Sequence, residues 1–198
     1  MVLAFLITTV IGKECRILYR ESFTADQSMF QLEEDKNIYT QKLESLSDAE
    51  TRSIRDKFFE KIAEKAKKEV GNCDVKTYEK DLNNLTSDGI VPTTQMGYFS
   101  IRTRRSKPII LWNSAINTTL LFVLHPDENR ILAENNMKIM IKYMQDYCNI
   151  FSQPSNALLK PDRIKSILDV FLPNGLLLFM NHALIKQLKT KIEISMAS

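Results

Sequence analysis

The chain has 198 residues, 44% of them hydrophobic and 26% charged, a balance typical of one globular domain and not of a disordered chain. Its 27 basic and 24 acidic side chains leave a formal charge of +3. This excess is too small for the continuous basic stripe that non-specific nucleic-acid binding requires. We therefore expect a single domain over residues 1–198 that does not bind nucleic acid.

The cysteine pattern and the first segment indicate where the chain works. Cys15, Cys73 and Cys148 are odd in number and widely separated, so they predict neither a disulfide framework nor a zinc site. Residues 1–11 are rich in strand formers and lack the basic start of a signal peptide, which favours a buried first strand. No segment reaches the ~18 apolar residues of a membrane span. A reducing compartment fits best.

The first 23 residues of the chain predict a β-hairpin. A turn at residues 12–14 returns the chain into a second strand over residues 15–23. Its alternation places Ile17 and Tyr19 on one face of the sheet and Leu18 on the other. The polar residues that follow are only weakly patterned.

A long amphipathic helix is predicted next. Ser47 and Glu50 form a capping box, and apolar residues at helical spacing continue almost to Gly71. The lysines of this helix interleave with glutamates, which predicts a solvated face held by ion pairs four residues apart. Residues 71–93 are polar, and we expect them to form a mobile connector.

Three strands and then three helices complete the predicted order. The strands cover residues 96–104, 108–113 and 118–124. A helix starting at Pro126 and Asp127 carries a methionine-rich stripe, which we interpret as core packing and not as a binding groove. The order ββαβββ followed by helices predicts an α+β fold with an antiparallel sheet.

The last two helices are joined by an apolar strip (residues 176–180). Pro161 opens a short helix that buries one apolar face, and Pro173 and Gly175 end it. The strip is too short to cross a bilayer, and Asn181 then caps a final helix. This arrangement predicts a packing device and not a catalytic one.

Catalytic and cofactor motifs are missing from the sequence. His125 and His182 lack acidic neighbours at a spacing that would make either one a metal ligand or a general base. No nucleophile elbow, phosphate-binding loop or metalloprotease motif occurs. We therefore expect neither an enzyme nor a bound cofactor, although a nucleophile and base brought together by the fold would reopen the question.

One cluster of charges is a candidate contact site, which we call the basic turn (Arg102, Arg104, Arg105 and Lys107). It lies where a hairpin is predicted between the third and fourth strands. Such a cluster suits an acidic partner or a phosphoinositide headgroup, but basic hairpin turns are commonly just solvated.

The ordering of elements and several residue runs resemble the sigma subunits of adaptor protein complex five and, more distantly, the small chains of clathrin adaptors. The most specific run begins at Asp162 and ends at Asn181. The matching residues are Met1-Val2, Ala4-Phe5-Leu6-Ile7, Cys15-Arg16, Leu18-Tyr19, Trp112, Leu132-Ala133-Glu134, Asp162-Arg163-Ile164, Ile167-Leu168, Phe171-Leu172-Pro173, Gly175, Leu177-Leu178-Phe179 and Asn181. The resemblance implies a longin-like fold, a five-stranded antiparallel sheet with helices on both faces.

The resemblance also implies a non-catalytic subunit that assembles with large zeta and beta chains and a medium mu chain, and works with spatacsin and spastizin. It implies a cytoplasmic protein peripherally bound to late endosomes and lysosomes, in sorting and retrieval. A longin module of a vesicle-tethering complex is the alternative. For subunit packing we select Leu176, Leu178 and Phe179 in the apolar strip, and we expect a chain that is poorly soluble alone.

Overall fold

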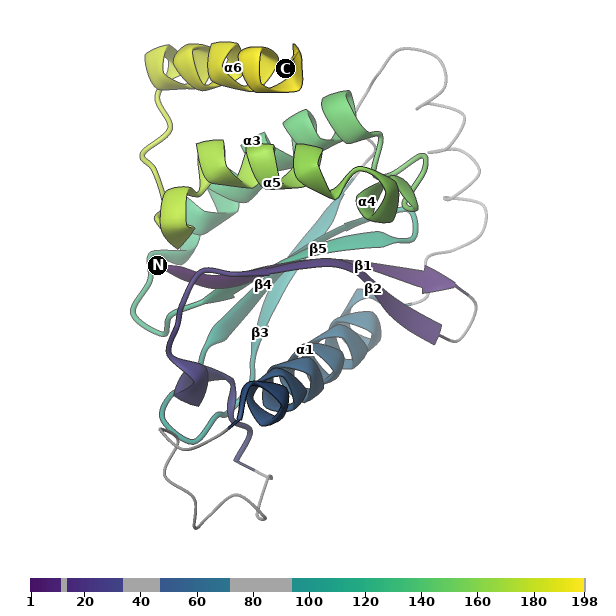
Figure 1. The fold of residues 1–198 in the computed structure, drawn as a ribbon, viewed down its shortest axis with the longest axis vertical. Coiled ribbons are helices and arrows are strands. Elements are labelled where there is room, and N and C mark those ends of the chain that lie inside the picture. The colour runs from purple at the N-terminus through teal and green to yellow at the C-terminus, as the bar shows by residue number, and fades with distance from the viewer. Residues whose placement is uncertain (12–13, 34–46, 72–93, 198) are drawn as a thin grey trace.

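The computed structural model describes residues 1–11, 14–33, 47–71 and 94–197. They form three layers, with one helix below a central sheet and the remaining long helices above it (Figure 1). The strands are β1 Val2–Ile11, β2 Glu14–Ser22, β3 Gln95–Ser100, β4 Ile109–Ala115 and β5 Thr118–Leu124. The helices are η1 Gln27–Phe30, α1 Asp48–Val70, α3 Arg130–Cys148, α4 Asn156–Leu159, α5 Pro161–Phe171, η4 Pro173–Gly175 and α6 His182–Ala197.

The five strands form one antiparallel sheet in the order β2-β1-β5-β4-β3. β1 and β5 pair at its centre, and every residue of β5 is buried. The uninterrupted apolar runs of these two strands suit positions that are covered on both faces. The predicted α+β, longin-like arrangement is therefore confirmed, and β2 and β3 are the edges of the sheet.

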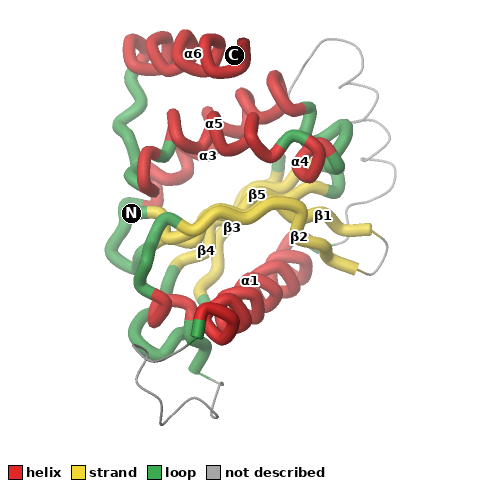
Figure 2. The backbone as a smooth tube through the Cα atoms, in the orientation of Figure 1, coloured by secondary structure: helices red, strands yellow, loops and turns green. Residues whose placement is uncertain are grey.

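Each face of the sheet carries its own core. Helices lie on both sides of the sheet (Figure 2). On one face, α1 packs Phe58, Phe59 and Ile62 against side chains of β1, β4 and β5. The ring of Phe30 in η1 makes T-shaped contacts with both phenylalanines of α1. On the other face, α3 and α5 bury the methionine stripe Met137, Met140 and Met144 with the four apolar residues of α5, Ile164, Ile167, Leu168 and Phe171. α6 packs on α5, farther from the sheet. The prediction that the methionines are core is confirmed.

A β-bulge corrects the predicted alternation of the second strand. The pairing with β1 shifts register between Ile7 and Thr8, so Leu18 has no partner opposite it. Ile17 consequently packs in the α1 core, whereas Leu18 and Tyr19 both pack in the core of the other face. The prediction that Ile17 and Tyr19 share a face was wrong, because the extra residue of a bulge resets the period of two.

Three of the predicted helix starts are confirmed. The Ser47–Glu50 capping box, Pro161 in the first turn of α5, and Asn181, whose Oδ1 accepts from the Leu184 amide at 2.8 Å, are all present. The predicted start of the next helix at Pro126 was wrong. Asn129 caps α3 instead, since its side chain accepts from the Leu132 amide.

The end of β3 and the break between the later helices also differ from prediction. β3 ends at Ser100 and not at residue 104, because the chain leaves β4 there and Thr103 makes a single bridge to Leu32. The break between the helices contains the one-turn helix α4, so four α-helices follow the sheet in the described part of the chain. The predicted connector lies almost wholly outside the described residues, as does Cys73.

Candidate functional site

In the part of the chain that the structure describes, neither histidine is paired with a nucleophile. His125 follows the last residue of β5, and its Nδ1 lies 3.5 Å from the Asp127 carboxylate, which is 90% exposed. His182 is an exposed residue at the start of α6. Within the described ranges, neither imidazole hydrogen-bonds to a serine or cysteine, so no nucleophile and base are paired.

The two described thiols are poor nucleophiles. Burial raises the pKa of Cys148 to about 11 and also raises the pKa of Cys15, so both remain protonated near neutral pH. The Cys15 thiol donates a long hydrogen bond of 3.5 Å to the carbonyl of Ala63. Among the residues that the structure describes, no group of three His, Cys, Asp or Glu side chains could hold a metal ion.

The basic turn connects β3 to β4 as predicted, and it is docked on residues 26–33. The Arg104 amide donates to the Gln31 carbonyl at 3.0 Å. Arg102 lies 3.8 Å from Glu33 and Arg105 lies 3.9 Å from Asp26. These arginine side chains are 70% and 64% exposed, so the two ion pairs are solvent-screened and leave the cations reachable from outside.

The apolar strip begins where Gly175 contacts the first strand. Its φ is +76°, and a Cβ there would lie 2.3 Å from the Val2 carbonyl oxygen and 2.7 Å from the Phe23 Cβ. Only glycine fits both the backbone conformation and the space. The short helix η4, which follows α5, is thus held against β1. The strip then continues from η4 to α6.

The three candidate packing residues of the strip do not share one environment. Leu178 is half-buried against the core, and its carbonyl accepts a hydrogen bond from Asn136 of α3. Leu176 is 56% exposed and Phe179 is 79% exposed. An exposed phenylalanine beside an anchored leucine leaves apolar surface available to another molecule.

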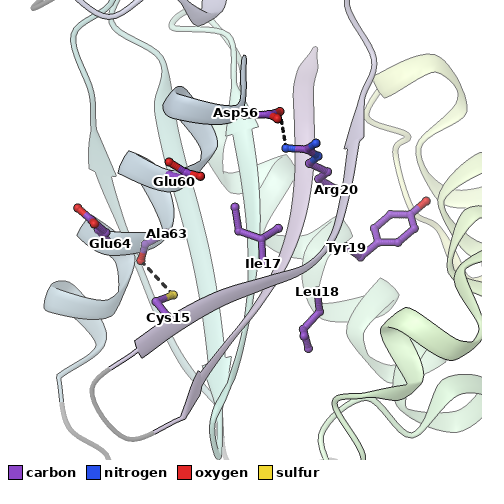
Figure 3. Close-up of a pocket in the computed structure, with 9 residues that line it drawn as sticks. All are labelled: Cys15, Ile17, Leu18, Tyr19, Arg20, Asp56, Glu60, Ala63 and Glu64. Atoms are coloured by element: carbon purple, nitrogen blue, oxygen red, sulfur yellow. Dashed lines mark hydrogen bonds and ion pairs between the residues drawn. The ribbon is translucent and has the colours of Figure 1, made fainter. Parts of the chain in front are cut away.

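A groove between β2 and α1 is the surface that sequence reasoning missed (Figure 3). Its volume is about 670 Å³, and an adjoining hollow of about 670 Å³ continues it towards Lys67 and Lys68. Ile17 and Cys15 of β2 and Ala63 of α1 provide its apolar part. Leu18 and Tyr19 point to the opposite side of the sheet.

Acidic side chains from successive turns of α1 line this groove. Arg20 neutralises Asp56 across it at 2.5 Å, whereas Glu60 and Glu64 make no ion pair or hydrogen bond within the described residues. No pair of charges four residues apart within α1 forms a salt bridge. The prediction that ion pairs with this spacing hold the solvated face of the helix was therefore wrong. The spacing 56, 60 and 64 was the available signal, but Glu60 and Glu64 were interpreted as part of a solvated face held by ion pairs.

These observations define a class of protein. A longin-like domain without a paired nucleophile and base in its described part, and with several surfaces suited to contacts, is typical of a small chain in a larger assembly. None of the helices in the described ranges has the length and apolar character that crossing a bilayer requires.

Sequence comparison identifies the family. The family model described as AP-5 complex subunit sigma-1 matches residues 1–193, so the chain belongs to the AP-5 complex subunit sigma-1 family. A human protein named AP-5 complex subunit sigma-1 is 29% identical over 114 residues. That alignment covers 55% of this chain and 57% of the human protein. Sigma subunits of this family are adaptor-complex proteins without catalytic activity, which confirms the predicted family and non-enzymatic class.

Proposed function

We propose that this chain is the small, non-catalytic subunit of a heterotetrameric adaptor complex in vesicle-mediated protein transport. The observation that carries the proposal is the family match over residues 1–193, supported by a longin-like sheet with helices on both faces. The same match favours an adaptor subunit over the alternative of a vesicle-tethering module. The role of the chain is to stabilise the complex.

The proposed partners are a large zeta chain, a large beta chain and a medium mu chain, with spatacsin and spastizin recruited through the complex. The proposed location is the cytoplasmic surface of late endosomes and lysosomes, with the chain held peripherally. The proposed process is sorting and retrieval from late endosomes. These assignments rest on membership of the family.

The apolar strip is the proposed surface for subunit packing. Leu178 faces the core and its carbonyl is bound by Asn136, which fixes the backbone of the strip. Leu176 and Phe179 then point outward from a rigid segment, and burying them against a large subunit would remove apolar surface from water. We therefore propose that Leu176 and Phe179 contact a large subunit, whereas Leu178 anchors the strip to the core of this chain.

The basic turn is the proposed contact for an acidic partner or an anionic lipid headgroup. Arg102 and Arg105 keep most of their side-chain surface exposed, and Lys107 is exposed beside them. Reversing Arg102, Arg104, Arg105 and Lys107 to glutamate should reduce membrane recruitment in cells. Unchanged recruitment and unchanged partner binding would remove this surface from the account.

Affinity purification from cells followed by mass spectrometry tests the assignment. The tagged chain should recover the two large chains and the medium chain in equal amounts. A doubly substituted chain, Leu176→Ser with Phe179→Ser, should fold but recover less of the large subunits. Leu159→Ser is a matched control, because that leucine is 73% exposed on α4 and lies outside the strip. A stable monomer that recovers none of these chains contradicts the proposal.

A further inference from the structure

The free edge of β2 borders the groove beside α1. β2 is an outer strand of the sheet, and in the described part of the chain its backbone pairs only with β1. In an antiparallel strand, alternate residues direct their N–H and C=O groups away from the partner strand. These outward groups can template the addition of another extended segment.

The groove supplies side-chain selectivity next to this edge. Ile17 and Ala63 provide apolar contact, and the Arg20–Asp56 pair bounds the groove at one end (Figure 3). Between that pair and the lysine end of the neighbouring hollow, Glu60 and Glu64 carry unneutralised charge on the α1 side. A segment carrying two cations is therefore complementary in charge.

The spacing of the two glutamates suits an extended chain. Residues one turn apart on a helix are separated by ~6 Å along its axis. Alternate residues of a β-strand are separated by ~6.8 Å and point to the same face. Lysine or arginine at positions i and i+2 of an added strand would therefore face Glu60 and Glu64 together.

We infer that the β2–α1 groove binds an extended basic segment of a partner protein, which adds to the sheet as a strand along β2. This site is separate from the apolar strip and goes beyond the proposed assembly role. A second copy of the chain is a poor occupant, because pairing two β2 edges would bring two acidic walls together. The selectivity comes from Glu60 and Glu64, and the backbone of β2 supplies the remaining affinity.

Peptide titration of the full chain tests the inference. The probe is a labelled, acetylated octapeptide of threonine with two lysines at alternate positions, and binding is followed by fluorescence anisotropy. The double variant Glu60→Lys with Glu64→Lys should weaken binding at least ~10-fold, since two attractions become repulsions. Glu69→Lys with Asp146→Lys changes the net charge equally, and both residues are exposed away from the groove. That control should change the affinity less than ~2-fold.

Two altered probes separate strand addition from simple charge attraction. An octapeptide with the lysines adjacent keeps its charge but directs them to opposite faces, and it should bind at least ~3-fold more weakly. Two N-methylated octapeptides, each methylated at one of the two sets of alternate backbone amides, remove the N–H donors of one edge of the added strand. One of the two should bind at least ~10-fold more weakly, because its methyl groups replace the donors that face β2. The inference is overturned by an octapeptide that does not bind at millimolar concentration, by equal loss in the control variant, or by no effect of N-methylation. The inference is also overturned if the free chain dimerises and the Glu60→Lys and Glu64→Lys changes strengthen the dimer. That result would assign the groove to a second copy of the chain.

Discussion

Asn136 Nδ2 donates a hydrogen bond of 2.8 Å to the carbonyl oxygen of Leu178, which joins the middle of α3 to the apolar strip. The same amide donates to the Leu132 carbonyl at 2.9 Å, so one buried side chain satisfies two backbone acceptors. The strip has no regular secondary structure of its own, and this contact holds it in place.

Replacing Asn136 with alanine should therefore destabilise the fold by about 1–3 kcal/mol, because the Leu178 carbonyl loses its donor. Asn135→Ala is the matched control, since this neighbouring side chain is exposed and the helix propensity changes equally. Guanidinium unfolding of both variants measures the difference. Equal stability of the two variants would show that the contact does not hold the strip.

Two adjacent strip residues should respond differently to a charge. Leu178→Asp places a carboxylate against the core and should cost about 2–4 kcal/mol, enough to unfold much of the chain or leave it without partners. Phe179→Asp changes a side chain that is 79% exposed and should leave the melting temperature nearly unchanged. Thermal unfolding by circular dichroism distinguishes them, and a similar loss in both would contradict the inward and outward assignment.

Gly97 should be intolerant of any side chain. It lies opposite Trp112 in the β3–β4 ladder, and a Cβ there would be 2.5 Å from Trp112 Cζ2. Gly97→Ala should therefore cost about 1–3 kcal/mol through displacement of the indole. Because Trp112 is the single tryptophan, its fluorescence reports both the displacement and the unfolding midpoint. Gln95→Ala, on the same strand and exposed, should change neither.

Alkaline pH should destabilise the protein through Cys148. Burial raises the pKa of its thiol from 9.0 to about 11, so the folded chain retains a proton that the unfolded chain loses. This contribution is complete below pH 9 and is lost as pH rises towards 11, amounting to about 2–3 kcal/mol. The pKa values of Tyr19, Tyr143 and Tyr147 are raised too, which adds to the decline at higher pH.

The variant Cys148→Ala isolates the thiol from the tyrosines. It should have a shallower fall of the unfolding free energy between pH 9 and pH 11 than the parent chain, measured in guanidinium under reducing conditions. Parallel curves for the two chains would mean that Cys148 titrates alike in the folded and unfolded states.

The elements with strong local signals were predictable from sequence. Some elements carry signals that depend only on neighbouring residues in the chain. These signals are a capping box for α1, a proline in the first turn of α5, and apolar residues on both faces of β1 and β5, and the four elements were located closely. The bulge at Leu18 was not predictable, because a register shift depends on the strand that pairs with it. The start of α3 was missed because Pro126 competes with Asn129 as a start signal.

The surfaces were predictable only in part. The basic turn and the apolar strip stand out as runs along the chain, so their residues could be selected from sequence as candidates. Which strip residues face outward was not, since the Asn136 contact that orients the strip joins residues 42 positions apart. The groove was missed for the same reason. Glu60 and Glu64 look like an ordinary solvated helix face until β2 is placed beside them.

Native mass spectrometry of the chain co-expressed with the two large subunits and the medium subunit tests whether it is a stoichiometric part of the proposed complex. We expect one dominant species that contains each of the four chains once, and depletion of that species when Leu176 and Phe179 are both serine. A chain that stays outside the assembly as a folded monomer, while the other three subunits associate without it, would contradict the assignment of a stabilising small subunit.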